Sequence, residues 1–382
     1  MKCEALLQKI DELVPQYIKV WEDVCRIESP TASKEGVDAV GAYFVRLAQK
    51  KGWKVEVYPQ EKSGDVIQII LNADVNENPV TLSGHIDTVH PIGSFGENPV
   101  YRDEKYLYGP GTSDCKGGVV ASVLAMDALE QCGFRKRPVY LLLQTDEETG
   151  SSTSGGATIR KICELAQTSV AFLNTEPHPK GKAVMTRKGI LRYRFIVHGK
   201  AGHSSVCYSV ANAVAEAAHK IIEMEKMKDP DGLTCNCGVI HGGTVANSVA
   251  EECIFEADIR FATKEQEQEA KKIAQEVAEH VYVKGCSCTL QQKSGRPAME
   301  YAQCNFDLLD RINEIYEANG LPVLEAQMGR GGSDAAYTTI YNIPCVDSIG
   351  VSGKGEHSIR EAAELDSLAA SAKRQAAVVW GI

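Results

Sequence analysis

Short, almost uninterrupted apolar runs alternate with helical patterns through the first half of the chain, and this alternation constrains the fold most. Apolar runs at residues 66–71, 79–82, 139–144 and 169–173 predict strands that are covered on both faces. Helical patterns occupy residues 4–28, 36–50, 117–131 and 159–166. Strands that alternate with helices predict an α/β layer with a largely parallel sheet.

The pattern changes near Arg187. Strand patterns follow at residues 190–197, 234–240, 252–260 and 286–292, and helical patterns at 210–227 and 264–280. The order β-α-β-β-α-β is that of a ferredoxin-like unit. We therefore expect a discontinuous α/β domain of residues 1–186 and 297–382, with residues 187–296 inserted as a second domain.

Composition excludes several classes of protein. The 43% hydrophobic and 24% charged fractions are typical of a soluble globular protein, and the net charge of -10 argues against nucleic-acid binding. No secretory signal and no apolar run of about 18 residues is visible, so neither secretion nor a membrane partner is expected. The 13 cysteines are an odd number scattered over the chain, which favours reduced thiols in the cytoplasm. The Cys-x-Cys pairs at residues 235/237 and 286/288 lack zinc-ribbon spacing and are interpreted as ordinary thiols.

Polar residues stand where the apolar runs end. His85 and Asp87 lie in Ser-Gly-His-Ile-Asp-Thr and, two residues apart on an extended chain, point to the same side. Asp114 stands in a Gly-rich turn before a helix, but that turn lacks the motifs of nucleotide-binding loops. Taken singly, a His and an Asp after a strand are more often ordinary loop residues, and an Asp before a helix is more often a plain N-cap.

Asp146, Glu147 and Glu148 form an acidic run at the end of another apolar strand. A nearby cation would relieve their repulsion, with one carboxylate as a metal ligand and another as a general base; the alternative is a solvated acidic loop. Glu176 follows the next strand, and His357 stands in a Gly-rich loop before the last helix. Two histidines with several carboxylates suit a pair of zinc-like ions that activate water and polarise a carbonyl.

In this order, the motifs resemble the dinuclear zinc peptidases and amidohydrolases, the family of glutamate carboxypeptidase, acetylornithine deacetylase, succinyl-diaminopimelate desuccinylase, aminoacylase and tripeptidase. The resemblance implies a mixed sheet flanked by helices and two divalent metal ions per chain, zinc with cobalt or manganese as alternatives. It implies that His85 and Glu176 bind one ion, that Glu148 and His357 bind the other, and that Asp114 bridges them.

The resemblance also implies roles around these ligands. Asp87 would orient His85, and Glu147 would be the general base that takes a proton from the attacking water and delivers it to the leaving amine. The peptide bond between Asp114 and Cys115 is expected to be cis.

The inserted domain is similar to the family's lid and dimerisation domain, so a homodimer is expected. His203 would reach a partner's active site and steady the oxyanion, and Asn247 and Arg260 would bind substrate. Gly332 and Ser333 match a Gly-rich loop near the substrate carboxylate. Alternative readings are a surface histidine, an ordinary salt bridge for Arg260 and a helix N-cap for Ser333.

These residues predict a metal-dependent hydrolase that cleaves an amide bond of an N-acyl amino acid or short peptide with a free carboxylate. One alternative is a di- or tripeptidase that recognises a free amino terminus. The other is a non-catalytic metal- or peptide-binding member, which loss of the base or of a ligand would signal; all are present. Pro177-His178 and Cys115 depart from the family pattern and weaken assignment to one named enzyme.

Overall fold

The computed structural model describes residues 3–329 and 331–382, and these form two units with separate hydrophobic cores. The first unit contains the described residues up to Thr186, together with Tyr301–Gly329 and Ser333–Ile382. The second contains Arg187–Glu300 with Gly331 and Gly332. The chain thus returns to the first unit at residue 301, whereas the sequence placed the return at 297.

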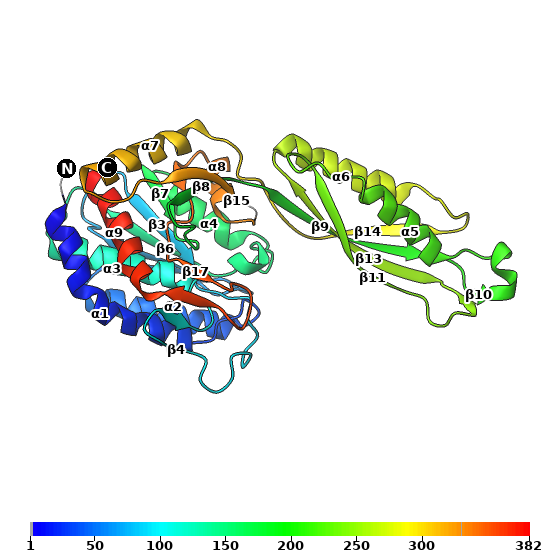
Figure 1. Cartoon of the computed structure of the whole chain (residues 1–382), viewed down its shortest axis with the longest axis horizontal. Coiled ribbons are helices and arrows are strands. Elements are labelled where there is room, and N and C mark those ends of the chain that lie inside the picture. Colours follow the sequence, from blue (N-terminus) through cyan, green and yellow to red (C-terminus); the bar gives the residue numbers. More distant parts are fainter. Residues whose placement is uncertain (1–2, 330) are drawn as a thin grey trace. The chain divides into compact units, whose positions relative to one another are not determined.

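The first unit is built on a six-stranded mixed sheet (Figure 1). Its strands, in spatial order, are β1 (Lys54–Tyr58), β2 (Val66–Leu71), β6 (Val139–Gln144), β3 (Val80–His85), β7 (Ala171–Asn174) and β16 (Cys345–Val346). The four strands from β6 to β16 pair in parallel, as the alternation of strands and helices predicts. The pairs β1–β2 and β2–β6 are antiparallel, so the sheet is mixed.

Helices cover both faces of this sheet. One core cluster joins alternate strand residues such as Leu141 and Leu143 to apolar residues of several helices. These helices are α1 (Glu4–Arg26), α2 (Lys34–Lys50), α3 (Lys116–Gln131), α7 (Gln303–Ala318) and α9 (Leu365–Gly381). Leu142 is buried outside that cluster and therefore faces the other side, where α4 (Ala157–Ala166) packs against β6.

Helix α3 is the central helix, because every residue from Lys116 to Leu129 is buried. Two glycines allow its first turn to approach the strand ends. A Cβ atom on Gly118 would lie 2.1 Å from the Thr175 carbonyl oxygen, and one on Gly84 would lie 2.3 Å from Thr175 Oγ1. This close packing brings Asp114, just before α3, next to the carboxyl ends of β3 and β7.

Several short strands lie beside the main sheet, and those of only two or three residues carry no detectable periodicity in the sequence. One small sheet has the order β17 (Gly353–Lys354), β18 (Ala362–Glu364), β5 (Tyr106–Tyr108), β4 (Tyr101–Arg102). Another pairs β8 (Lys182–Arg187) with β15 (Glu325–Gly329). The loop between β17 and β18 carries His357, so the first of these sheets fixes both ends of that loop.

The second unit has the ferredoxin-like order that the sequence predicts. Its elements are β9 (Gly189–His198), α5 (Ala213–Met224), β11 (Thr234–Gly242), β13 (Glu252–Phe261), α6 (Lys264–Glu279) and β14 (Ser287–Arg296). The sheet order is β11-β13-β9-β14, with every pair antiparallel. Alternate residues of β13, such as Phe255 and Ile259, are buried with apolar residues of α5 and α6. A separate ribbon pairs β10 (Gly202–His203) with β12 (Ser248–Val249).

Two further observations concern the whole described chain. None of the described helices is long and apolar enough to cross a membrane. The 13 cysteines, all among the described residues, form no disulfide.

Candidate metal centre

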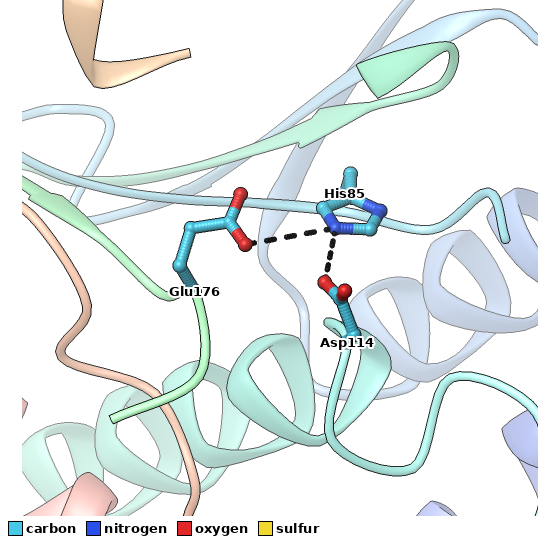
Figure 2. Close-up of side chains that lie close together, drawn as sticks. All are labelled: His85, Asp114 and Glu176. Atoms are coloured by element: carbon cyan, nitrogen blue, oxygen red, sulfur yellow. Dashed lines mark hydrogen bonds and ion pairs between the residues drawn. The ribbon is translucent and has the colours of Figure 1, made fainter. Parts of the chain in front are cut away.

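His85, the last residue of β3, lies between two carboxylates (Figure 2). Its Nε2 atom is 3.0 Å from Oδ1 of Asp114 and 3.9 Å from Oε2 of Glu176. Glu176 follows β7, the strand beside β3, so the parallel sheet brings its carboxylate to the same edge as His85. These three side chains form one group whose ligand atoms all lie within 4.8 Å of one another.

A second group of the same kind meets the first at Asp114. Nε2 of His357 is 3.3 Å from Oδ2 of Asp114 and 3.3 Å from Oε2 of Glu148. Glu148 belongs to the short 3₁₀ turn η1 (Glu147–Thr149) after β6, and His357 has a positive φ of 60° in the loop after β17. His85 is buried, whereas the His357 side chain is 60% exposed, so the second group faces solvent.

Asp114 is therefore shared, with one carboxylate oxygen directed at each histidine. Imidazole nitrogens and carboxylate oxygens are the donors that zinc and similar divalent ions accept. Each group supplies three such donors, and neither contains a cysteine. The residues present thus fit a pair of divalent cations with Asp114 between them.

The charges at this edge explain why a cation would be favourable. Burial raises the pKa of Glu148 to about 8, and burial followed by the Glu147 charge raises the pKa of Glu176 well above its ordinary value. Hydrogen bonds to Asp114 and Glu148 raise the pKa of His357 to about 10. The raised pKa values mean that these side chains bind protons more readily in the metal-free protein. Binding of divalent ions would release those protons.

Asp87 contacts His85 from the side away from Asp114. Its Oδ1 atom lies 3.4 Å from Nδ1 of His85, which fits the orienting role implied by the resemblance. The same carboxylate accepts hydrogen bonds from the backbone N–H groups of Glu147 and Glu148, each at 3.2 Å, and from the Thr31 hydroxyl at 2.6 Å. Asp87 therefore connects His85 to the turn that carries the two glutamates.

The acidic run after β6 divides into different environments. Asp146 turns away from the metal groups and accepts hydrogen bonds from the Ser154 backbone N–H and the Thr158 hydroxyl. Glu148 joins the second group. Glu147 is 7% exposed and belongs to neither group, yet its charge acts on Glu176. This placement is compatible with a proton-transfer role for Glu147 beside the metal ligands.

Sequence reasoning missed Glu361, which is 1% exposed. Its Oε1 accepts hydrogen bonds from the backbone N–H groups of Ser113 and Asp114 at 2.9 and 3.0 Å. Its Oε2 accepts one from Gly111 at 3.0 Å and lies 3.0 Å from Nε2 of His90. One carboxylate thus holds the loop that presents Asp114, and the buried His90 is a further partner of that carboxylate.

The peptide bond after Asp114 and the side chain of His178 lie near the site, and the first was expected to be cis. The peptide bond between Asp114 and Cys115 is cis. His178 is buried with Nδ1 2.7 Å from the Ser348 carbonyl oxygen, and burial lowers its pKa to about 4, so it is a neutral structural histidine.

The predicted residues of the second unit lie on its surface. His203 and Asn247 are exposed and close to each other, because the backbone N–H of Ser204 donates to the Asn247 carbonyl at 3.0 Å. The His203 ring accepts a hydrogen bond from the backbone N–H of Ser205 at 3.2 Å. These contacts hold His203 in place without burying its ring.

Arg260, Gly332 and Ser333 do not share one environment. Arg260 forms an ion pair with Asp258, with Nε 2.6 Å from Oδ1, which is the alternative that the sequence left open. Gly332 lies with the second unit. Ser333 is buried in the first, where its hydroxyl oxygen accepts hydrogen bonds from Asn174 and from the backbone of Ala335 near the start of α8 (Ala335–Ile340). The N-cap of α8 is Asp334, so Ser333 supports the turn just before the helix instead of capping it.

Comparisons with known proteins agree on one protein family. Residues 81–380 match the sequence model of Peptidase family M20/M25/M40. Carboxypeptidase G2 from Pseudomonas sp. (strain RS-16) is 29% identical over 373 residues, which cover 93% of this chain and 88% of that protein.

Two solved structures share the fold over nearly the whole chain. A tripeptidase from Staphylococcus aureus has a TM-score of 0.79 at 20% identity, covering 96% of this chain and 97% of its own. A dinuclear metal-binding peptidase of the M20 family from Bacillus subtilis has a TM-score of 0.69 at 17% identity, covering 97% and 98%. The match over residues 81–380 and the two metal-ligand groups lead to one conclusion: the chain belongs to Peptidase family M20/M25/M40 and is a metallopeptidase-type hydrolase.

Proposed function

We propose that this enzyme hydrolyses the amide bond of an N-acyl amino acid or short peptide with a free carboxylate, using two divalent metal ions. The main support is the arrangement at Asp114, whose two carboxylate oxygens face two separate groups of donors. His85 and Glu176 complete one group, and Glu148 and His357 complete the other. Zinc suits this mixture of imidazole and carboxylate donors best, with cobalt or manganese as alternatives.

When bound, such ions activate water and polarise the carbonyl of the substrate. Glu147 takes the proton of the attacking water and later delivers it to the leaving amine. The backbone of Glu147 is held by Asp87, which also contacts His85, so the base and a metal ligand share one anchor. The Glu361 carboxylate accepts a hydrogen bond from the backbone N–H of Asp114 and so helps to position this residue.

The inserted unit completes the proposal as a lid and a dimerisation domain. Its exposed His203 steadies the oxyanion in a partner subunit, and Asn247 beside it binds substrate. Arg260 would bind the substrate carboxylate through guanidinium N–H groups other than the two that donate to Asp258. The proposal keeps the cytoplasmic location that the 13 scattered cysteines lead us to expect.

A hydrolysis screen tests this proposal. The protein is loaded with zinc and offered N-acetyl amino acids, N-blocked dipeptides with a free carboxyl terminus, and free di- and tripeptides, with a chelated sample as control. The proposal predicts turnover of the N-acylated substrates that the chelator abolishes. Turnover of free peptides alone would replace it with the di- or tripeptidase reading. Turnover that survives complete metal removal would contradict metal dependence.

A further inference from the structure

An apolar pocket of about 530 Å³ opens beside the second metal-ligand group, within the first unit. Pro30, Ala32, Val89, Pro91 and Ile92 supply its apolar wall, and Glu148, a member of the metal-ligand group, stands at its edge. The pocket therefore adjoins the second metal-ligand group at Glu148.

Hydrogen bonds that involve Asp87 and its neighbours hold both the apolar wall of the pocket and the turn that carries Glu148. The backbone N–H of Thr31 donates to the Thr88 carbonyl at 3.1 Å, and the backbone N–H of Thr88 donates to Ser29 at 2.9 Å. The Thr31 hydroxyl donates to Asp87, which also binds the backbone of Glu148. All three segments that line the pocket, residues 30–33, 88–92 and 148–149, are thus linked to Asp87 by hydrogen bonds or by direct chain connection.

The loop after Thr88 keeps apolar side chains in solvent although it is anchored at both sides. His90 is buried against Glu361, and the backbone N–H of Gly93 donates to Glu28 at 2.8 Å. Ile92, between these anchors, remains 64% exposed, and Val89, just before His90, is 36% exposed. Large apolar groups held out on an anchored loop beside a candidate active site indicate a surface that binds something apolar.

Charge decides which part of the substrate this is. Of the described residues that line the pocket, Glu148 is the one with a charged side chain, and none is a lysine, arginine or histidine. A substrate carboxylate would meet no cation on this wall and would lie near the Glu148 carboxylate. The flank of the substrate without the free carboxylate, which is the acyl group, suits the wall instead.

We propose that this pocket is the acyl subsite and that it selects uncharged, apolar acyl groups longer than acetyl. The inference rests on the proposed amide hydrolysis, because it assigns one flank of that substrate. Each methylene that leaves water for the apolar wall strengthens binding by roughly threefold to fourfold. A five-carbon acyl chain would therefore be preferred to acetyl by roughly tenfold or more.

The test compares N-acetyl-, N-pentanoyl- and N-glutaryl-alanine, because glutaryl has the length of pentanoyl but ends in a carboxylate. Calorimetry measures their binding to the zinc-loaded Glu147→Ala protein, and kcat/KM measures their hydrolysis by protein with Glu147 intact. Pentanoyl is expected to exceed acetyl by roughly tenfold or more in both measurements, and glutaryl is expected to show no gain.

Two pocket variants and one control locate the effect. Ile92→Asp places a charge in the wall and Ala32→Trp fills it, so each should lower the ratio of pentanoyl to acetyl, in binding and in kcat/KM, toward one. Ile340→Asp is the control, because Ile340 is 57% exposed in the same unit and outside the pocket. It should keep the preference.

The possible outcomes separate the subsite from the proposed function. Hydrolysis without a chain-length preference, an unchanged preference in both pocket variants, or an equal loss for all acyl groups would overturn the subsite and leave amide hydrolysis standing. A pentanoyl preference in binding that Ile92→Asp removes, without hydrolysis of any amide, would support the pocket and refute the proposed function.

Discussion

The candidate residues of the two units differ in what holds them. In the α/β unit, His85 contacts Asp114 and Glu176, which stand 29 and 91 positions later in the sequence. In the inserted unit, His203 contacts Ser205 and Arg260 contacts Asp258, each only two positions away. The residues of the first set are brought together from distant parts of the sequence by the fold. The residues of the second set are held by contacts with near neighbours in the sequence.

This difference separates two kinds of experiment. The metal groups are complete within one unit, so metal binding should be measurable on a single chain and should depend on that unit alone. His203 and Asn247 are exposed on the inserted unit. A test of their proposed roles therefore requires substrate or a partner subunit. Loss of metal should therefore follow changes in the α/β unit only, and changes in the inserted unit should affect turnover only.

The largest effect is expected for Asp114→Ala, which removes the residue shared by both groups. Both ions should be lost at equilibrium and activity with them, because each group keeps only two donors. Metal content by mass spectrometry after dialysis measures this, with Asp310→Ala, an exposed site on α7, as the control. A variant that retains two ions per chain would refute the shared role.

Glu147→Ala is expected to keep both ions and to lower kcat by about 10²–10⁴-fold, the usual range for removing a general base. Glu147 belongs to neither ligand group, so metal content should equal that of the unmodified protein. Steady-state kinetics and metal analysis on one preparation give both quantities. Full activity in this variant would show that another group moves the proton.

His203→Ala should leave metal content unchanged and lower kcat by about 10²–10³-fold, as expected for one lost oxyanion contact. Mixing this variant with Glu147→Ala sharpens the comparison between the units. If His203 acts in a partner's site, the mixed dimer holds one site with both residues intact, and activity returns. No recovery in verified mixed dimers would contradict action across the dimer.

Glu361→Gln should weaken metal binding by about 10–100-fold, the range for residues that support metal ligands. The amide cannot accept all four contacts that the carboxylate makes with Gly111, Ser113, Asp114 and His90. Competition with a coloured chelator gives the affinity, and the absorption spectrum of the cobalt form reports the ligand geometry. Unchanged affinity and spectrum would mean that the loop holds Asp114 without Glu361.

A smaller effect is expected from pH. The pKa of His357 rises on folding from 6.5 to about 10 and that of Glu148 from 4.5 to about 8, so the folded metal-free protein binds more protons than the unfolded chain. Stability from His357 is present below pH 6.5 and lost toward pH 10, and Glu148 acts in the same direction between pH 4.5 and 8. Metal binding requires these protons to leave. The difference in Tm between zinc-loaded and chelated protein should therefore grow from pH 6 to pH 9, and a constant or shrinking difference would contradict the account.

The parts of the fold that sequence could predict are those with long periodic patterns. The strands that end at His85 and before Glu147 and Glu176 are apolar runs, so their carboxyl ends could be placed at one edge of a sheet. The resemblance to the zinc peptidase family and the α/β class with a ferredoxin-like insertion are confirmed.

The parts that could not be predicted depend on contacts between distant, irregular segments. Glu361 stands in a loop, and its partner Gly111 lies 250 positions earlier, so no local pattern links them. Thr31 likewise reaches Asp87 across 56 positions from the break between two helices. The antiparallel direction of β2 against β6 also escaped prediction, because an apolar run carries no information on strand direction.

The proposed two-metal centre depends most on Asp114 lying between two ions. Diffraction from zinc-soaked crystals at the zinc absorption edge tests this directly, because anomalous peaks locate each ion. The account predicts two peaks per chain, one beside Oδ1 with His85 and Glu176 and one beside Oδ2 with Glu148 and His357. A single peak, or two peaks of which only one contacts Asp114, would contradict it.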